Sequence, residues 1–381
     1  MTESKLKIEE VIQETETFSD DALFNITSFG TDMTFRELIT MYEEGDLEKP
    51  EMQRNYVWTK NEASRFIDSV LLGLPVPSIF LAKTKEEKRL IVDGYQRIMT
   101  IFDYVKTGIF GGDSKPFGLS NSEIINEKWR GKMFAELAPD EQRKIRNSAI
   151  HAIVFEQKHP QDDTGMYQIF ERINTSGRVL KPQEIRNCVY HGAFNHLLIE
   201  LNKIPVWRKV LDLPVADSRM GDMELILRAI AFSELLTQPE KEQRQINLVK
   251  YLNLYMGRNA NINRIQSEQL QTSFTDVLTF LDQAIGNHLF RNGKTKDGIL
   301  SFSAKVNPSI LDSVFAATVQ ARSKVLKLDG IVDLSEQYTE LINNPDYQQA
   351  ISVRTTTIAN IKKRIEIASQ TLFEVEYEWE I

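Results

Sequence analysis

The sequence is poor in cysteine and histidine. Only one of its 381 residues is a cysteine, Cys188, which excludes an internal disulfide and a cysteine-rich zinc site. The histidines number five, and the nearest pair, His191 and His196, are five positions apart. Such a pair does not share a helical face as a metal-binding pair would. We therefore expect no metal centre built on cysteine or histidine, and the lone thiol fits the reducing cytoplasm.

Long hydrophobic runs are also absent. No apolar stretch approaches the roughly 20 residues of a membrane span. The N-terminal Met1-Thr-Glu-Ser-Lys5 lacks the apolar core of a signal peptide. The net charge of −8 argues against a protein that coats nucleic acid non-specifically, although it leaves room for a local basic groove. We expect a soluble, cytoplasmic protein that does not bind membranes and is long enough for two domains.

Familiar enzyme motifs are missing too. The sequence has no Walker-type phosphate loop, no dinucleotide-binding glycine spacing and no Gly-x-Ser-x-Gly elbow. Cys188 lies in an apolar helical context, which favours a buried thiol over a nucleophile. Carboxylate-based hydrolysis through a bound cation stays open, with Asp93 or Glu171 as candidates.

The hydrophobic pattern divides the chain into three parts. Residues 1–25 are rich in Glu and Asp and predict an acidic arm. Residues 26–190 mix strand and helix patterns, and helices open there at two Thr-x-x-Glu capping boxes, Thr34 and Thr59. In residues 191–381 the apolar residues recur with the 3.6-residue period of an α-helix. The strands that we predict are 24–29, 78–82, 89–92 and 149–155. The helices that we predict in the last part are 194–201, 223–236, 248–255, 270–284, 310–325 and 356–370. The fold class is therefore α+β, with an N-terminal α+β domain followed by an all-helical C-terminal domain.

The segment 90–97 combines a strand, a glycine turn and a helix start. The apolar run Leu90-Ile-Val-Asp93 breaks at Gly94, and an amphipathic helix follows from Tyr95. The first N–H groups of a helix have no partner within it, and the helix dipole adds positive charge there. Arg97, one turn further on, is able to reach back with a bidentate cation. The pattern predicts an anion pocket that suits phosphate; an ordinary strand–turn–helix with a surface arginine is the alternative.

A second polar segment is Gln53-Arg-Asn-Tyr-Val-Trp58, which holds a guanidinium, two amides and two aromatic rings. Such a set is able to hold phosphate and to stack on a base. The alternative is a loop that Tyr56 and Trp58 anchor to the core.

A third segment runs from Phe170 through Asn174-Thr-Ser-Gly177 to Asn187 and is rich in hydroxyls, amides and arginines. It also has the form of a helix end, with Gly177 in the left-handed position and Pro182 opening the next helix. The structural and functional interpretations are compatible here.

Four segments occur in an order that resembles a known family. They are Gln53-Arg-Asn-Tyr-Val-Trp58, Ile67-Asp-Ser-Val-Leu-Leu-Gly-Leu-Pro-Val-Pro77, Val92-Asp-Gly-Tyr-Gln-Arg97 and Phe170-Glu-Arg-Ile-Asn-Thr-Ser-Gly177. Together they look like the N-terminal domain of GmrSD-type modification-dependent restriction enzymes. Lys305-Val-Asn-Pro308 is similar to the family's helical part, so the resemblance covers most of residues 30–320.

The resemblance implies a ParB/sulfiredoxin-like core at 26–190 that binds a nucleotide. In that family an Asp-Gly-Gln-Gln-Arg motif is tied to NTP binding and to hydrolysis that governs a DNA-directed defence activity. Asp93, Gly94, Gln96 and Arg97 match this motif, whereas Tyr95 stands in place of its first glutamine. We expect Tyr95 to impair NTP hydrolysis more than NTP binding.

A second departure concerns the nuclease. Longer relatives carry a histidine-based, metal-using nuclease motif, but no histidine follows His288 in this chain. We expect no complete nuclease of that kind here, and any DNA cleavage would then come from a nuclease encoded separately.

The leading hypothesis is an NTP-binding regulatory or sensor component of a restriction-like, anti-phage defence system, with NTP hydrolysis as an open question. ATP or GTP, with or without Mg²⁺, is the expected ligand, and DNA and a second copy of the chain are further candidate partners. Asp93 and Arg97 are the catalytic candidates, with Asp93 orienting Arg97 or a cation. The phosphate contacts that we predict are Gln53, Arg54, Gly94, Gln96 and Arg97, beside Tyr95. Tyr56 or Trp58 would flank the base, and the residues closing the far side would be Arg172, Asn174 and Arg186.

The alternative hypothesis is a non-catalytic DNA-binding or protein-interaction module with a degenerate nucleotide site. In it the same groove holds a backbone phosphate of DNA. Salt dependence separates the two hypotheses, because multiple phosphate contacts make DNA affinity fall steeply with salt.

Overall fold

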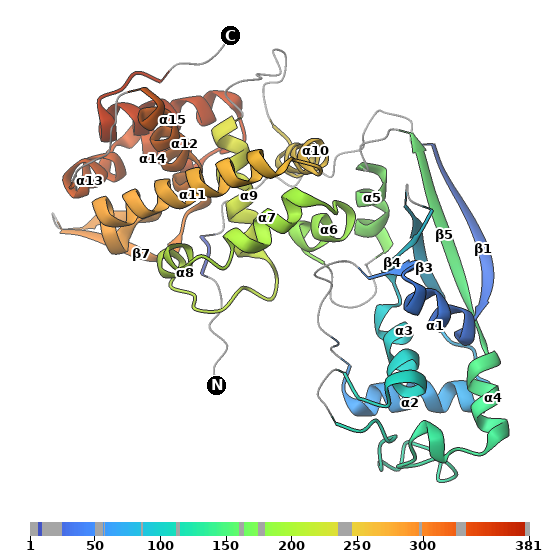
Figure 1. The fold of residues 1–381 in the computed structure, drawn as a ribbon. Helices are drawn as coiled ribbons and strands as arrows, with labels where there is room; N and C mark the ends of the chain where they lie inside the picture. The colour runs from blue at the N-terminus through green and yellow to red at the C-terminus, as the bar shows by residue number, and fades with distance from the viewer. Residues whose placement is uncertain are drawn as a thin grey trace. The chain divides into compact units, whose positions relative to one another are not determined.

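The computed structural model describes residues 7–9, 25–49, 56, 58–84, 87–111, 115–159, 164–173, 180–234, 246–296, 299–324 and 333–377. Internal contacts divide the chain into two units (Figure 1). The sheet unit comprises Ala22–Leu180 and Glu184–Val189, and the helical unit comprises Met1–Asp21, Lys181–Gln183 and Tyr190–Ile381. The domain limits of 26–190 and 191–381 stay predictions, and the predicted acidic arm lies outside the described residues except at 7–9 and Asn25.

The sheet unit is built on a five-stranded mixed sheet with the order β1-β5-β3-β4-β2. Its strands are β1 (Asn25–Thr34), β2 (Leu47–Glu48), β3 (Ile79–Lys83), β4 (Arg89–Asp93) and β5 (Ala149–His159). The pairs β1–β5 and β3–β4 are antiparallel, whereas β3–β5 and β2–β4 are parallel. The four strands predicted from the sequence are confirmed, and β1 extends further than its apolar start suggested.

Helices pack on one face of this sheet. They are α1 (Phe35–Glu44), α2 (Lys60–Leu72), α3 (Tyr95–Phe102), the π-helical turn η1 (Asp103–Thr107), the 3₁₀ turn η2 (Phe134–Glu136) and α4 (Pro139–Asn147). Two further helices of the chain are α5 (Thr164–Ile173) and α6 (Pro182–Val189). The capping residues are as expected: Thr34 and Thr59 accept from the third backbone N–H of α1 and α2, and Gly45 and Gly73 end these helices in the left-handed conformation.

The core of the sheet unit is formed by the strand side chains that point toward the helices, which are every second residue along each strand. Ile150, Ala152 and Val154 of β5 face the helices and are at most 1% exposed. They pack with the apolar faces of α1, α2 and α3 in one cluster. Because successive side chains of a strand point to opposite faces, the residues between them lie on the other side of the sheet. There Phe80 of β3 stacks on Phe155 of β5, with ring centroids 5.9 Å apart.

The helical unit follows the predicted helices closely. Its helices are α7 (Ala193–Leu201), α8 (Pro205–Leu211), α9 (Gly221–Glu234), α10 (Leu248–Asn259), α11 (Arg264–Ile285), the 3₁₀ turn η4 (Gly286–His288), α12 (Pro308–Lys324), α13 (Ser335–Asn343), α14 (Pro345–Ser352) and α15 (Ile358–Phe373). The α+β fold class is thus confirmed.

One expectation for this unit was wrong: it is not all-helical. A two-stranded antiparallel hairpin joins β6 (Arg291–Lys296) to β7 (Ile299–Val306). The apolar–polar alternation of Ile299-Leu-Ser-Phe-Ser-Ala-Lys-Val306 and the Asp297-Gly298 dipeptide before it are ordinary hairpin signals in the sequence.

The N-terminal residues 7–9 extend this hairpin. The Glu9 N–H donates to the Val306 carbonyl at 2.9 Å, and the Val306 N–H donates to the Lys7 carbonyl at 3.0 Å. The Asn307 side chain donates to Glu9 Oε2 at 2.8 Å, and its Oδ1 accepts from the backbone of Ser309 and caps α12. The Lys305–Pro308 motif therefore ties the N-terminal residues to the start of α12.

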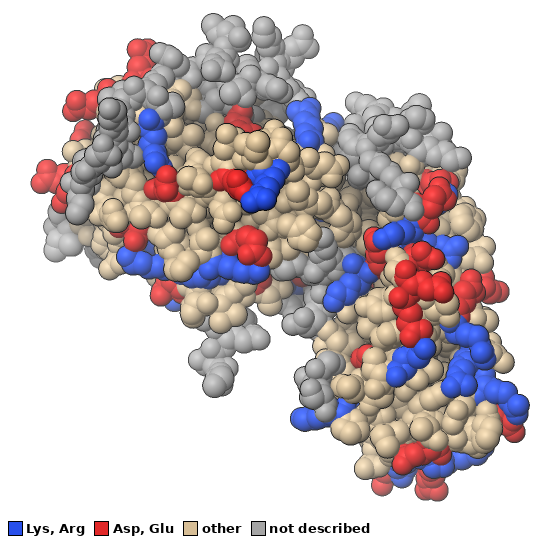
Figure 2. All heavy atoms as spheres, viewed as in Figure 1, with Lys and Arg blue, Asp and Glu red and all other residues tan. Residues whose placement is uncertain are grey.

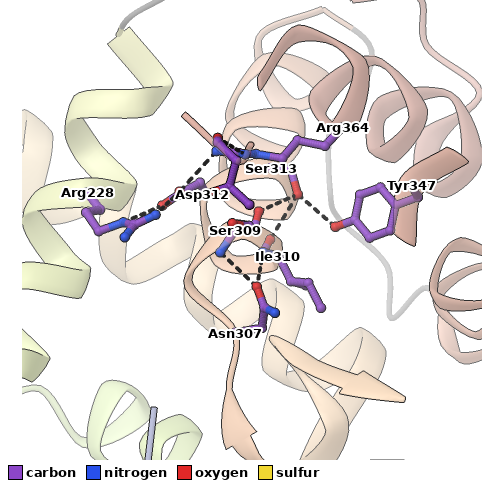
Figure 3. A network of polar contacts seen from close by, with 9 residues as sticks. Arg228, Asn307, Ser309, Ile310, Asp312, Ser313, Tyr347 and Arg364 are labelled. Atoms are coloured by element: carbon purple, nitrogen blue, oxygen red, sulfur yellow. Dashed lines mark hydrogen bonds and ion pairs between the residues drawn. The ribbon is translucent and has the colours of Figure 1, made fainter. Parts of the chain in front are cut away.

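A charged network lies at the centre of the helical unit (Figure 3). Asp312 of α12 accepts from both Nε and Nη2 of Arg228 of α9, at 3.3 and 2.6 Å. Arg364 of α15 donates to the same carboxylate at 3.4 Å and to the Thr355 carbonyl at 2.6 Å. All three charged side chains are buried, with Asp312 fully inaccessible. Two buried guanidinium groups thus share one carboxylate, which joins three helices.

Candidate functional site

The turn after β4 has a conformation that only glycine adopts without strain. Gly94 has φ 102° and ψ 4°, in the left-handed region, and it is the residue from which α3 starts. A Cβ on Gly94 would lie 2.4 Å from Cγ2 of Ile79 on the neighbouring strand. Backbone conformation and close packing therefore both require glycine, and the chain passes directly from β4 into α3.

The N-terminus of α3 has no side-chain cap. Its first backbone hydrogen bond runs from the Ile98 N–H to the Gly94 carbonyl at 3.0 Å, and its N-cap residue, Gly94, has no side chain that could cap the helix. The first N–H groups of a helix find no acceptor within it, and they carry the positive end of the helix dipole. This helix start has the electrostatics of an anion site.

Arg97 is fixed over the turn by two contacts. Its Nη2 donates to Asp93 Oδ2 at 2.7 Å and to the Ser78 carbonyl at 3.2 Å. The Arg97 side chain is 15% exposed, while that of Asp93 is 39% exposed. Among the described residues, none accepts from the buried Nε of Arg97. The guanidinium is thus held in place by one of its three nitrogens, which leaves donor capacity at the turn.

The second predicted segment lies beside this turn. Because β2 runs parallel to β4, the chain leaves both strands at the same end of the sheet. The Trp58 N–H donates to Gln96 Oε1 at 3.3 Å. The Tyr56 hydroxyl lies 2.6 Å from the Thr100 hydroxyl, which donates to the Gln96 carbonyl at 2.7 Å. The structure therefore brings together the described part of Gln53–Trp58 and the start of α3.

The two aromatic rings of this segment anchor it to the core. Tyr56 packs edge-on against Phe110, and Trp58 packs edge-on against Phe66, at centroid distances of 5.3 and 5.7 Å. Both rings are partly buried against the hydrophobic cluster of the sheet unit. The anchoring interpretation is confirmed, while a role of either ring in flanking a base stays a prediction.

Tyr95 belongs to the core, although the sequence placed it among the ligand contacts. Its ring is 8% exposed and packs within the hydrophobic cluster. Burial, with smaller effects from Tyr42 and Asp103, raises the pKa of its phenol to about 12. The bulky ring is therefore accommodated behind the turn, so the departure from the family motif removes an amide there without filling the surface of the site with a phenol.

The other site residues predicted from the sequence are partly outside the described residues, partly exposed and partly buried. Gln53, Arg54 and Asn174 lie outside the described residues. Arg172 is exposed in the last turn of α5, next to the exposed Glu171. Arg186, in contrast, is only 1% exposed within α6, so its side chain lies in the protein interior. Closure of the far side of the site by these residues stays a prediction.

Sequence analysis missed Asp103, a buried carboxylate behind the turn. It is 8% exposed in the π-helical turn η1, and its Oδ2 accepts from the Gly111 N–H at 3.2 Å. Burial raises the pKa of Asp103 to about 6, against the opposing hydrogen bonds from Gly111 and Thr107. Asp103 also raises the pKa of Tyr42, Tyr56 and Tyr95, so these phenols surround it. The signal in the sequence was an aspartate between Ile101 and Tyr104, both buried at 1% exposure.

The raised pKa of Asp103 predicts a specific pH dependence. The folded protein holds this proton up to about pH 6, whereas an unfolded aspartate loses it near pH 4. The carboxyl therefore favours the fold below pH 4, and this contribution is lost as the pH rises to 6. We expect Asp103→Asn to increase the free energy of unfolding at pH 7 by of the order of 1 kcal/mol and to change it little at pH 4. Urea denaturation of both proteins between pH 4 and 8 measures this, and a pH-independent difference would contradict it.

Fold and turn together define an α+β domain in which a strand–glycine–helix turn presents an arginine and a helix N-terminus at one end of a sheet. Residues 35–191 match the model of a protein family described as the GmrSD restriction endonuclease, N-terminal domain. The match confirms the resemblance over these residues and connects this part of the chain with restriction systems. Among curated proteins and solved structures, none matches the chain.

Two further properties of the described residues bear on function. They contain no group of three or more His, Cys, Asp or Glu side chains that could hold a metal ion. Within the same residues, none of the helices combines the length and the apolar character needed to cross a bilayer.

Proposed function

We propose that the domain at 35–191 binds a nucleoside triphosphate as the regulatory part of a restriction-like, anti-phage defence component. The phosphates would lie over the Gly94–Arg97 turn, against the first N–H groups of α3 and the guanidinium of Arg97. The observation that carries this proposal is the Arg97 side chain, which Asp93 and Ser78 hold over an uncapped helix start. Helix N-termini and arginine forks are the two common protein donors to phosphate.

Tyr56 and Trp58, which lie beside the start of α3, also support the proposal. The Trp58 N–H donates to Gln96, and the rings of Tyr56 and Trp58 anchor the segment to the core. A guanidinium and an amide four or five positions before Trp58 are close enough in sequence to reach a ligand on the turn. The family motif and the local contacts therefore favour the same place.

The turn offers one carboxylate, that of Asp93, to a nucleotide-bound magnesium ion. Nucleotide-bound Mg²⁺ is commonly held by one or two protein carboxylates together with phosphate oxygens and water. Asp93 provides one half-exposed carboxylate at the turn, and its Oδ1 takes no part in the ion pair with Arg97. Asp93 would thus hold the ion where it neutralises phosphate charge, while it also orients Arg97.

The proposal is tested by titrating the full chain with ATP, GTP, CTP and UTP, and with the matching monophosphates. We expect at least one triphosphate to bind at micromolar concentration and its monophosphate to bind at least about tenfold more weakly, because the turn contacts phosphate groups. Phosphate release, measured with and without duplex DNA, then decides whether binding leads to hydrolysis. A protein that binds none of the triphosphates at millimolar concentration, yet binds DNA with steep salt dependence, would contradict the proposal and favour a DNA-binding module.

A further inference from the structure

A set of basic side chains lies on three neighbouring helices of the sheet unit. We call it the basic stripe: the exposed Arg36 in the first turn of α1, Arg65 on α2 and Lys144 on α4, together with the partly buried Arg146 on α4. The chain as a whole carries a net charge of −8, so a local excess of cations does not follow from its composition. Figure 2 shows Lys and Arg side chains gathered over the part of the sheet unit where Figure 1 draws α4.

These four cations have no acidic partner among the described residues. Arg36 donates to the amide of Asn147, and Arg146 lies over the ring of Phe134. Neighbouring cations differ in this respect, because Arg143 is paired with Asp140 and Lys128 with Glu141. Within the described part of the chain, no ion pair therefore neutralises the positive charge of the stripe residues.

Packing joins the four residues into one surface. Helix α4 contacts both α1 and α2. The Lys144 ammonium lies 3.6 Å from the Cβ position of Gly73, which ends α2. Arg65 precedes Gly73 by eight residues on the exposed side of α2, which corresponds to about 12 Å along the helix axis. In the same last turn of α4, Asn147 accepts from Arg36 at 3.3 Å.

We propose that the basic stripe binds the sugar–phosphate backbone of duplex DNA. Cations fixed on packed helices and spaced along a surface suit regularly repeated phosphates, and such contacts position a protein on DNA without reading its sequence. The choice of DNA as the polyanion rests on the proposed restriction-like function, whereas the position of the surface does not. The stripe residues belong to α1, α2 and α4, whereas the proposed nucleotide site is at the start of α3, so DNA and nucleotide would contact different elements of one domain.

The exposed apolar residues near the stripe favour a duplex over a single strand. Single-strand sites present aromatic rings on which bases stack. At the end of α2 the large exposed apolar side chains are Leu72 and Leu74, which are aliphatic. Among the described residues of the sheet unit, Phe29 of β1 is the one strongly exposed aromatic side chain.

The test measures binding of a fluorescein-labelled duplex of about 25 base pairs to the full chain, by anisotropy, without nucleotide and at several salt concentrations. The variant is Arg65→Ala/Lys144→Ala. The matched control is Arg264→Ala/Lys363→Ala, which removes two exposed cations from the helical unit. We expect the stripe variant to bind at least about tenfold more weakly at 100 mM salt and to flatten the slope of log K against log salt by about 2, because each phosphate contact contributes about 0.9. The control should match the wild type.

Three outcomes would overturn the proposal: no duplex binding by the wild type at 50 mM salt, equal loss in the variant and the control, or tighter binding of a single strand or an acidic peptide than of the duplex. Both residues of the variant are exposed and without acidic partners, so circular dichroism should show an unchanged fold. Since the assay contains no nucleotide, failure of NTP binding would leave its outcome unaffected, and the two proposals fail separately.

Discussion

Replacing Asp312 by alanine is expected to lower the free energy of unfolding by about 3–5 kcal/mol, the cost of leaving a buried charge without its partner. Asp312 is the carboxylate that both Arg228 and Arg364 contact, and none of the three residues is more than 6% exposed (Figure 3). Its removal would leave two guanidinium groups facing each other in the interior of the helical unit.

The electrostatic cost of burying two arginines beside one carboxylate appears in the pKa of Arg364. Burial is the main effect that lowers its pKa to about 10, and the like charge of Arg228 lowers it further, while Asp312 opposes both. The guanidinium carbons of both arginines lie 5.9 Å from the ring of Phe232, which adds a cation–π contact to each. The network therefore depends on its one carboxylate more than on either arginine.

Urea denaturation of the wild type and three variants tests this account. Asp346→Ala removes the exposed ion pair with Lys363 and should cost less than about 1 kcal/mol. Arg364→Met leaves the buried pair of Arg228 and Asp312 balanced, so it should cost clearly less than Asp312→Ala. An Asp312→Ala variant as stable as Asp346→Ala would show that the network does not hold the helices together.

The fold could be predicted where the signals are local. Each of these signals depends on a few neighbouring residues. The N-caps of α1 and α2 come from the hydroxyls of Thr34 and Thr59, and their C-caps from Gly45 and Gly73. The β3–β4 hairpin comes from the short connection between Lys83 and Arg89. These local elements led to the correct fold class. The helical period likewise located the long helices of the second unit, because a 3.6-residue repeat needs no distant partner.

Features that depend on distant contacts could not be predicted. The sequence does not show that β1 pairs with β5 more than 110 positions away, nor that the two-residue strand β2 lies beside β4. Arg228, Asp312 and Arg364 look like surface charges in the sequence, since their pairing joins three helices. For the same reason Tyr95 was placed in the site although its ring lies in the core, and Asp103 was overlooked.

The candidate site itself was located from the sequence because its geometry is local. A glycine between an apolar strand and an amphipathic helix requires the left-handed turn that the structure has at Gly94. The four-residue spacing of Asp93 and Arg97 placed their side chains within reach of each other, and they form an ion pair at 2.7 Å. What the sequence left open was how the arginine is held, and the Ser78 carbonyl provides that contact.

Loss of Arg97 is expected to weaken nucleotide binding strongly while the protein stays folded. A charge-assisted hydrogen bond contributes about 1.5–3 kcal/mol, which corresponds to roughly 10- to 150-fold in affinity. In Arg97→Ala the loss should lie at the upper end, because the Asp93 carboxylate is then unpaired beside the phosphates and repels them. Arg89→Ala is the matched control: Arg89 is a partly buried arginine at the opposite end of β4 and contacts the sulfurs of Met33 and Met41.

The most direct test of a phosphate site at this turn is the affinity of the preferred triphosphate for Arg97→Ala relative to Arg89→Ala, measured by calorimetric titration of proteins whose fold circular dichroism has verified. We expect Arg89→Ala to bind within about threefold of the wild type and Arg97→Ala to bind at least about 30-fold more weakly, a difference of about 2 kcal/mol. Equal affinity of the two variants would show that the nucleotide lies elsewhere on the protein.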